Sequence, residues 1–176
     1  LDYLTVMEGR GRECEPARLE ANAPGIVFYT SGTTGRPKGV VHSGIAFVIQ
    51  NYIYAKYHMD HKQDDIFWCT ADVGWLTMHI WGLAGALANG VTTVVYEGAI
   101  DHPAPDQFYR IMEKYRVNKL FTAPTALRML KSLGEDMLNK FDLTPLDVVT
   151  LVGEPFDPET WQWTHDVLGK GDIYVN

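Results

Sequence analysis

The sequence predicts an α/β protein with a largely parallel sheet and helices packed on its faces. Short apolar runs of strand length alternate with amphipathic stretches of helical length along the chain, which is typical of parallel sheets covered by helices. Hydrophobic residues make up 46% of the 176 positions and aromatic residues 12%. This is a globular composition, with enough apolar material for one sizeable core or two small ones.

The first half of the chain is expected to contain three strands and two helices. Residues 25–30 indicate a buried strand, and residues 39–42 indicate a second short strand. Ser43 is a suitable N-cap for the helix that follows. One face of that helix carries Ile45, Val48, Ile49, Tyr52 and Ile53. Residues 65–71 form the next expected strand, and the Gly-Ala-Leu segment at 81–88 indicates a tightly packed helix.

The second half continues the alternation. Strands are expected at 91–98, 118–123, 147–153 and 172–176. The helices between them are indicated by Phe108, Ile111, Met112 and Tyr115, then by Ala126, Met129, Leu130 and Leu133 after Pro124, and then by Trp161, Thr164, His165 and Leu168. Ligands bind at the carboxyl ends of the strands in such sheets, so the segments that follow the strands are the candidate site.

Composition excludes several classes of function. Fifteen Lys and Arg against 22 Asp and Glu give a net charge of −7, which disfavours nonspecific binding to nucleic acid or to anionic membranes. Cys14 and Cys69 have no metal-type or redox-type spacing, which suits a reducing cytoplasm. The N-terminus has no signal-peptide pattern, and the most apolar stretch, 80–96, is too short and too rich in glycine to span a bilayer.

A glycine- and hydroxyl-rich loop, YTSGTTGRPKG at 29–39, separates the first two expected strands. Glycines let backbone N–H groups converge on an anion, hydroxyls add neutral donors, and a lysine supplies charge. The loop is not a Walker-type P-loop, because Pro37 precedes Lys38 and Gly39 follows it. The alternative is a plain hairpin turn, which needs neither the hydroxyls nor a Pro-Lys-Gly end. The loop therefore predicts phosphate binding.

Residues 29–40 match throughout the pattern [YF]-T-S-G-[ST]-T-G-x-P-K-G-[VA]. The chain therefore resembles the adenylate-forming superfamily of acyl-CoA synthetases, luciferases and peptide-synthetase adenylation domains. TADVGW at 70–75, TAPTALRML at 122–130 and VGEP at 152–155 resemble its acetyl-CoA synthetase branch. The resemblance implies a lead-in segment at 1–23 and an incomplete central part of an AMP-binding domain at 24–176.

The resemblance implies an AMP-forming ligase that activates a short-chain carboxylic acid with ATP and Mg²⁺ and transfers the acyl group to CoA. It implies phosphate contacts from Thr30, Ser31, Gly32, Thr33, Thr34 and Gly35. Lys38 would neutralise the departing pyrophosphate. Gly153, Glu154 and Pro155 would border the adenine, largely through their backbone. Trp75, Leu76, Thr77 and Val152 would shape the acyl pocket.

The chain also departs from the family pattern. The magnesium-holding Y-G-x-T-E motif and the adenylating lysine are expected beyond Asn176, and Leu1 is no initiator methionine. These features predict a piece of a longer enzyme, inactive alone and able to self-associate through open strand edges. Asp101 replaces the family's CoA-contacting asparagine, and Met78 replaces a glycine near the pocket. The alternative hypothesis is a stand-alone, non-catalytic nucleotide- or phosphate-binding module.

Several other residues are candidates for a functional site but are better explained by a structural role. His58, Asp60 and His61 are close in sequence but fit a solvated loop better than a metal site. The spacing of Trp161, Trp163 and His165 favours packing of a helix over a ligand-binding cluster. Cys69 is better explained as a buried cysteine in a strand than as a nucleophile. Two alternatives stay open at this stage. His79 is either a gate of the acyl channel or a packed core histidine, and Glu97 with Glu154 could form an acid/base pair.

Overall fold

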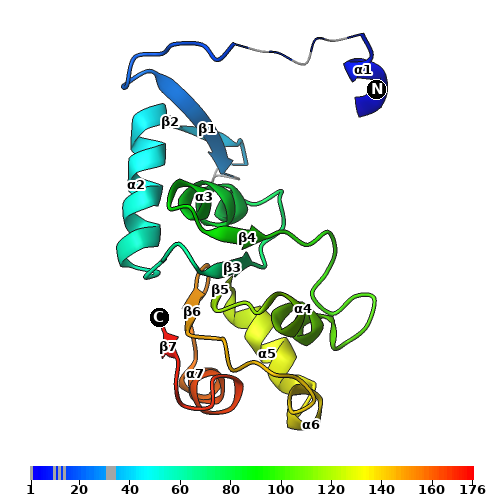
Figure 1. Ribbon diagram of the computed structural model, residues 1–176. Helices are drawn as coiled ribbons and strands as arrows, with labels where there is room; N and C mark the ends of the chain where they lie inside the picture. The colour runs from blue at the N-terminus through cyan, green and yellow to red at the C-terminus, as the bar shows by residue number, and fades with distance from the viewer. Residues whose placement is uncertain (1, 10, 12, 14, 31–34) are drawn as a thin grey trace.

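The computed structural model describes residues 2–9, 11, 13, 15–30 and 35–176 (Figure 1). Its elements are α1 (Tyr3–Met7), β1 (Pro24–Thr30), β2 (Lys38–Ser43), α2 (Gly44–Tyr57), β3 (Ile66–Cys69), the π-helix η1 (Met78–Gly85), α3 (Ala86–Ala88), β4 (Thr92–Val94), α4 (Gln107–Tyr115), β5 (Lys119–Thr122), α5 (Pro124–Ser132), α6 (Glu135–Leu138), β6 (Val148–Leu151), α7 (Pro158–Trp163), the π-helix η2 (Thr164–Leu168) and β7 (Tyr174–Val175).

A parallel five-stranded sheet in the order β4-β3-β5-β6-β7 forms the centre of the molecule. β5 is buried along its whole length, as expected for a central strand covered on both faces. The predicted fold class is therefore confirmed. The two edge strands are shorter than expected, at three residues for β4 and two for β7.

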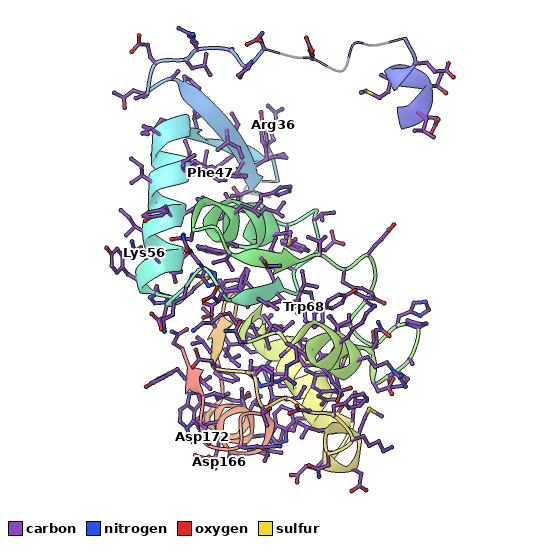
Figure 2. All side chains as sticks on the ribbon, in the orientation of Figure 1. Arg36, Phe47, Lys56, Trp68, Asp166 and Asp172 are labelled. Carbon is purple, nitrogen blue, oxygen red and sulfur yellow. The ribbon has the colours of Figure 1, made fainter. Side chains whose placement is uncertain are left out.

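Helices cover both faces of this sheet (Figure 1). Successive strand residues point to opposite faces, and Phe67 and Trp68 of β3 accordingly enter different hydrophobic clusters. Trp68, labelled in Figure 2, stacks on Phe108 of α4 with ring centroids 5.2 Å apart. Its cluster also takes in residues of α5, α7 and η2. The Phe67 cluster instead packs against η1 and α3, through Met78 and Ala86.

β1 and β2 form a separate antiparallel hairpin, paired from Pro24–Ser43 to Thr30–Lys38. The expectation of a buried strand at 25–30 is wrong, because β1 is mostly exposed and only Ile26 and Phe28 are half-buried. The two strands pair with each other, and one face of the hairpin packs against α2. Phe28 meets Phe47 of α2 at 6.1 Å between ring centroids, and Figure 2 shows Phe47 between the helix and the hairpin.

α2 begins as predicted, with the Ala46 amide donating to the Ser43 hydroxyl at 3.3 Å. Its buried residues are Asn51 and Ala55, which lie against η1. A Cβ built on Gly85 of η1 would lie 3.2 Å from the Ala55 Cβ, so the two helices meet through small residues. The predicted apolar face is largely exposed, with Ile45, Val48, Ile49 and Ile53 between 41% and 51% accessible.

The described residues before β1 form only the short helix α1, and residues 2, 4–9, 11, 13 and 15–22 are exposed. Figure 1 shows this segment extending away from the rest of the protein. That arrangement fits a lead-in, although the boundary at residue 24 stays a prediction. Among the helices of the described residues, none has the length and apolar character needed to cross a bilayer.

Candidate functional site

Three of the four family-like segments meet at one edge of the sheet. β3, β5 and β6 are neighbouring parallel strands, so the segments that follow them lie at the same, carboxyl edge. The Thr70 amide donates to the Phe121 carbonyl at 3.0 Å, and the Val152 amide donates to the Thr122 carbonyl at 3.2 Å. The Thr70 and Thr122 hydroxyls are also hydrogen-bonded, at 2.7 Å. Residues far apart in sequence are thereby joined in one surface.

The segment after β6 has a backbone that requires glycine. Gly153 has a φ of +96°, which L side chains rarely adopt, and no atom lies near the position its Cβ would take. Gly153, Glu154 and Pro155 are exposed, and Val152 is half-buried beneath them. The three residues expected to border the adenine are therefore accessible at the carboxyl edge.

The Glu154 carboxylate is tied to the start of α5. It accepts hydrogen bonds from the Thr125 amide at 3.0 Å, from the Thr125 hydroxyl, and from Arg128 Nη1 at 2.9 Å. These bonds, those from Thr125 first, hold the pKa of Glu154 below its usual range. Glu97 follows β4, which β3 and β5 separate from β6. The idea of an acid/base pair of Glu97 and Glu154 therefore finds no support in the fold.

Arg128, which the sequence analysis did not single out, contacts the segment after β6. Its guanidinium donates to Glu154, to Asp157 Oδ2 at 2.9 Å and to the Pro155 carbonyl at 3.1 Å. Asp157 also caps α7 by accepting from the Thr160 amide at 2.8 Å, and this bond followed by Arg128 lowers the pKa of Asp157. The sequence did offer a signal for this contact. An arginine stands four residues after Pro124, and two carboxylates, Glu154 and Asp157, follow the next strand.

Three of the expected acyl-pocket residues lie at the same edge around the turn after β3, and the fourth, Val152, follows β6. The Asp72 carboxylate accepts from the Gly74 amide at 2.7 Å, and the Asp72 carbonyl accepts from the Trp75 amide at 2.9 Å. This turn leaves Trp75 70% exposed and Leu76 38% exposed. Thr77 precedes η1 as its N-cap residue.

Met78, which replaces a glycine near the expected pocket, is a core residue. It is 2% exposed and lies in the same cluster as Cys69, with Val152 packed against that cluster. A Cβ built on Gly82 would lie 2.4 Å from the Met78 sulfur. The Met78 side chain therefore fills the core beneath η1.

The glycine-rich loop connects the two strands of the hairpin. Thr30 and Lys38 face each other at its base, and Lys38 is exposed. Gly35 has a φ of +80°, a backbone conformation that suits glycine, and none of the described atoms lies within 4 Å of the position its Cβ would take. Ser31, Gly32, Thr33 and Thr34 lie outside the described residues. Among the residues that are described, no hydrogen bond joins the hairpin to the three segments at the sheet edge.

The polar segment at 58–65 is only partly the solvated loop that was expected. His61 is 6% exposed and packs edge-on against Phe67 at 4.7 Å between centroids. Neither of its ring nitrogens has a hydrogen-bond partner, and burial lowers the pKa of His61 to about 4. The edge-on contact with Phe67 contributes to this burial. Within the described part of the chain, no group of three His, Cys, Asp or Glu side chains could hold a metal ion.

Three single-residue interpretations are settled by burial. Cys69 is buried in β3, and burial raises the pKa of its thiol to about 11, which confirms a structural cysteine. His79 is exposed, so the interpretation as a packed core histidine is wrong. Trp161 stacks on His165 at 5.3 Å while Trp163 is buried in the core. Helix packing, as expected, accounts for Trp163, whereas Trp161 is 38% exposed and, among the described residues, its only aromatic partner is His165 on the next helical turn.

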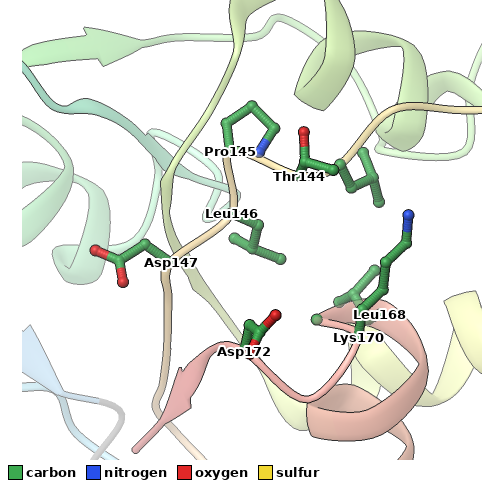
Figure 3. A pocket seen from close by; sticks show the side chains of 9 residues that line it. Thr144, Pro145, Leu146, Asp147, Leu168, Lys170 and Asp172 are labelled. Atoms are coloured by element: carbon green, nitrogen blue, oxygen red, sulfur yellow. The ribbon is translucent and has the colours of Figure 1, made fainter.

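Two cavities lie away from the carboxyl edge. One of about 290 Å³ is lined by residues that precede β6 and β7, among them Asp147, Lys170 and Asp172 (Figure 3). It therefore opens at the amino edge of the sheet, where Asp147 pairs with the buried Lys119 at 2.6 Å. The other, of about 500 Å³, lies beside α4 and is lined by Tyr96 and Arg110, among others. Neither cavity involves a predicted site residue.

Comparisons with known proteins agree with the fold described above. A family model described as AMP-binding enzyme matches residues 3–175. The chain is 44% identical over 171 residues to the acetyl-coenzyme A synthetase of Rhodobacter capsulatus, covering 97% of this chain and 26% of that protein. It is 48% identical over 158 residues to the acetyl-coenzyme A synthetase of Gemmatimonas aurantiaca, covering 90% of this chain and 24% of that protein.

Similarity extends to a solved structure. The crystal structure of Brucella canis acyl-CoA synthetase superposes with a TM-score of 0.84 at 31% sequence identity, over 96% of this chain and 30% of that one. The chain thus spans about a quarter of the length of the curated relatives that it matches.

Proposed function

Because the chain belongs to the AMP-binding enzyme family, we propose that residues 24–176 are the central part of the AMP-binding domain of a longer AMP-forming acyl-CoA synthetase. One observation carries the proposal. The segments 70–75, 122–130 and 152–155 meet at the carboxyl edge of neighbouring parallel strands, where such folds bind ligands. Relatives named acetyl-coenzyme A synthetase match the chain across 97% of its length.

The proposed reaction has two steps. A carboxylate oxygen attacks the α-phosphorus of ATP, an acyl-adenylate forms, and pyrophosphate leaves. The thiolate of CoA then attacks the acyl carbon, a thioester forms, and AMP leaves. The first step concentrates negative charge on the departing pyrophosphate, so that donors and cations placed around it stabilise the transition state.

The residues of the chain divide between these steps. The loop from Thr30 to Gly35 holds the β- and γ-phosphates, and Lys38 neutralises pyrophosphate as it leaves. The backbone of Gly153, Glu154 and Pro155 borders the adenine. Trp75, Leu76, Thr77 and Val152 line the space for the acid. The exposure of Lys38, Gly153 and Trp75 supports these roles, since each is accessible to a ligand.

Magnesium accompanies ATP in the proposed reaction, and proteins usually hold it through one or two carboxylates together with the substrate phosphates. Among the described residues, no group of three His, Cys, Asp or Glu side chains comes together to hold a metal ion. We assign no magnesium ligand among these residues and no step to the metal.

The decisive experiment separates the two half-reactions in the full-length synthetase. Lys38→Ala should slow acid-dependent ATP–pyrophosphate exchange by at least about tenfold, since a charge-assisted contact to the leaving group is lost. Transfer from preformed acyl-adenylate to CoA should change much less, because pyrophosphate is absent from that step. Arg36→Ala removes a cation from the same loop and is the matched control. Equal losses in both half-reactions would contradict the role of Lys38.

The 176-residue chain should bind ATP or pyrophosphate weakly and should catalyse no exchange. If the purified chain catalysed ATP–pyrophosphate exchange that depends on added carboxylic acid, the three quarters of the relatives' length that it does not cover would be dispensable for adenylation. A stand-alone nucleotide-binding module is not favoured, because the matched relatives are synthetases along nearly the whole chain.

We propose a short-chain acid as substrate, with acetate or propionate first. Leu76 stands where the acetyl-CoA synthetase branch usually has valine, and the added methylene narrows the pocket. One methylene is worth about 1–3 kcal/mol of discrimination, so Leu76 biases the choice among acids without fixing it. A series of kcat/KM values over straight-chain acids tests this. An optimum at a medium-length, long or aromatic acid would exclude the short-chain assignment and leave the family unchanged.

Self-association of the isolated chain is a further expectation. The edge strand β7 has no partner on its outer side among the described residues, and open edges pair with other chains. Light scattering should therefore detect species larger than a monomer, and a clean monomer at high concentration would contradict this. The cytoplasmic location stays a prediction from cysteine usage.

A further inference from the structure

Arg128 contacts three consecutive parts of the segment that follows β6. Its Nη1 donates to Glu154, its Nη2 to the Pro155 carbonyl and its Nε to Asp157. The distances of 2.9, 3.1 and 2.9 Å are all within the normal hydrogen-bonding range. All three nitrogens of one side chain on α5 are thus committed to one short loop.

We propose that Arg128 is a positioning residue for nucleotide binding, which fixes the backbone of Gly153–Pro155 in the geometry that accepts the adenine base. This inference rests on the proposed function, since it assumes that the segment borders the adenine. It extends that function to a residue on α5 that has no expected contact with ATP itself.

The backbone of Gly153–Pro155 needs a contact of this kind to hold its conformation. Gly153 adopts a φ of +96° with nothing near its Cβ position, and Gly153, Glu154 and Pro155 are exposed. No packing of side chains therefore holds this backbone, and glycine is the residue that loses most freedom when ordered. Thr125 anchors one oxygen of Glu154, and Arg128 anchors the other oxygen together with the next carbonyl.

The chemistry of the contact requires arginine. The guanidinium presents donors in a rigid planar fork, whereas the ammonium of lysine is a point charge on a flexible stem. A lysine could neutralise Glu154 or Asp157, but it could not donate at once to both carboxylates and to the Pro155 carbonyl between them. A substitution that keeps the charge therefore still releases the loop.

A purely structural role is the competing explanation, and the fold supplies its control. Lys131, one turn further along α5, pairs with Glu159 of α7 at 2.6 Å. This ion pair joins the same two helices without touching the segment 153–155. If Arg128 served only to hold α5 against α7, then Lys131→Met and Arg128→Met would have the same kind of effect.

The kinetic test uses the full-length synthetase. Arg128→Met should raise KM for ATP by roughly ten- to a hundredfold, since a misplacement on the scale of 1 Å has effects of that size. It should also lower the preference for ATP over GTP, because the loop borders the base. KM for the acid should stay within about twofold. Lys131→Met should leave all three quantities unchanged. Where Arg128→Met does not fold, Arg128→Lys is judged by the same criteria.

A second measurement needs no nucleotide. Hydrogen–deuterium exchange at the amides of residues 153, 154 and 156 should become faster in Arg128→Met and stay unchanged in Lys131→Met. Unchanged exchange would overturn the positioning role, and so would faster exchange with an unchanged KM for ATP. A parallel rise in KM for both ATP and the acid would also overturn it. If the unsubstituted enzyme does not use ATP, the proposed function fails, while the exchange data still decide whether Arg128 orders the loop.

Discussion

The ion pair between Lys119 and Asp147 should be strongly asymmetric in its energetics. Lys119 belongs to β5 and its side chain is 2% exposed, whereas the Asp147 side chain is 42% exposed. The two charged groups are 2.6 Å apart, and the nearest other carboxylate, Asp60, lies 3.9 Å from the ammonium. Removing the acid leaves a buried cation, while removing the base leaves an anion that water can reach.

The expected magnitudes follow from this difference in exposure. Asp147→Asn should cost about 3 kcal/mol of unfolding free energy, the lower end of the range for breaking a buried ion pair, because Asp60 still lies 3.9 Å from the ammonium. Lys119→Met replaces the cation with an apolar side chain of similar length. It should cost less than about 1 kcal/mol, because the exposed Asp147 is hydrated and buried pairs are often replaceable by apolar residues.

Urea denaturation of the chain, followed by far-ultraviolet circular dichroism and linear extrapolation, measures these quantities. The double substitution Lys119→Met with Asp147→Asn is the internal control, since it removes the buried cation together with its main partner and should recover most of the stability lost in Asp147→Asn. Equal losses in the two single variants, or a loss below about 1 kcal/mol for Asp147→Asn, would refute the reasoning.

Three more predictions concern other residues. Burial lowers the pKa of His61 to about 4 against 6.5 unfolded, although Asp65 and Asp60 favour its protonation and Lys119 opposes it. As the pH falls below 6.5, His61 is therefore protonated in the unfolded chain before it is protonated in the folded one. The free energy of unfolding should then fall by up to about 1.4 kcal/mol per pH unit between pH 6.5 and 4. His61→Leu should flatten that slope in urea titrations, and an unchanged slope would contradict the assignment. Gly153→Ala should cost about 1–3 kcal/mol through its positive φ alone, whereas Gly11→Ala, at an open position without a positive φ, should cost nothing measurable. Gly25→Ala should cost about 1–3 kcal/mol, because its Cβ would lie 2.5 Å from the Gly44 backbone; a melting temperature equal to that of the unsubstituted chain would contradict the close approach.

The sequence by itself determined the features that depend on neighbours along the chain. The apolar runs that became β3, β5 and β6, the N-cap at Ser43 and the motifs that follow the strands are set by local backbone preference and by spacing. Because parallel strands end at a common edge, the sequence was enough to place the segments 70–75, 122–130 and 152–155 at the carboxyl edge of the sheet. It did not make their strands neighbours, since β4 lies between β3 and β5 along the chain and at the outer edge of the sheet.

Only the tertiary structure decided which surfaces meet. The run at 25–30 has the composition of a buried strand, yet β1 pairs only with β2 outside the main sheet, since an apolar run does not specify its partner. α2 buries Asn51 and Ala55 because η1 offers small residues there. Arg128 reaches residues that lie 26 to 29 positions later in the chain. Local sequence carries no information on such a contact, because it exists only after β6 has paired beside β5 and the segment after β6 has been brought against α5.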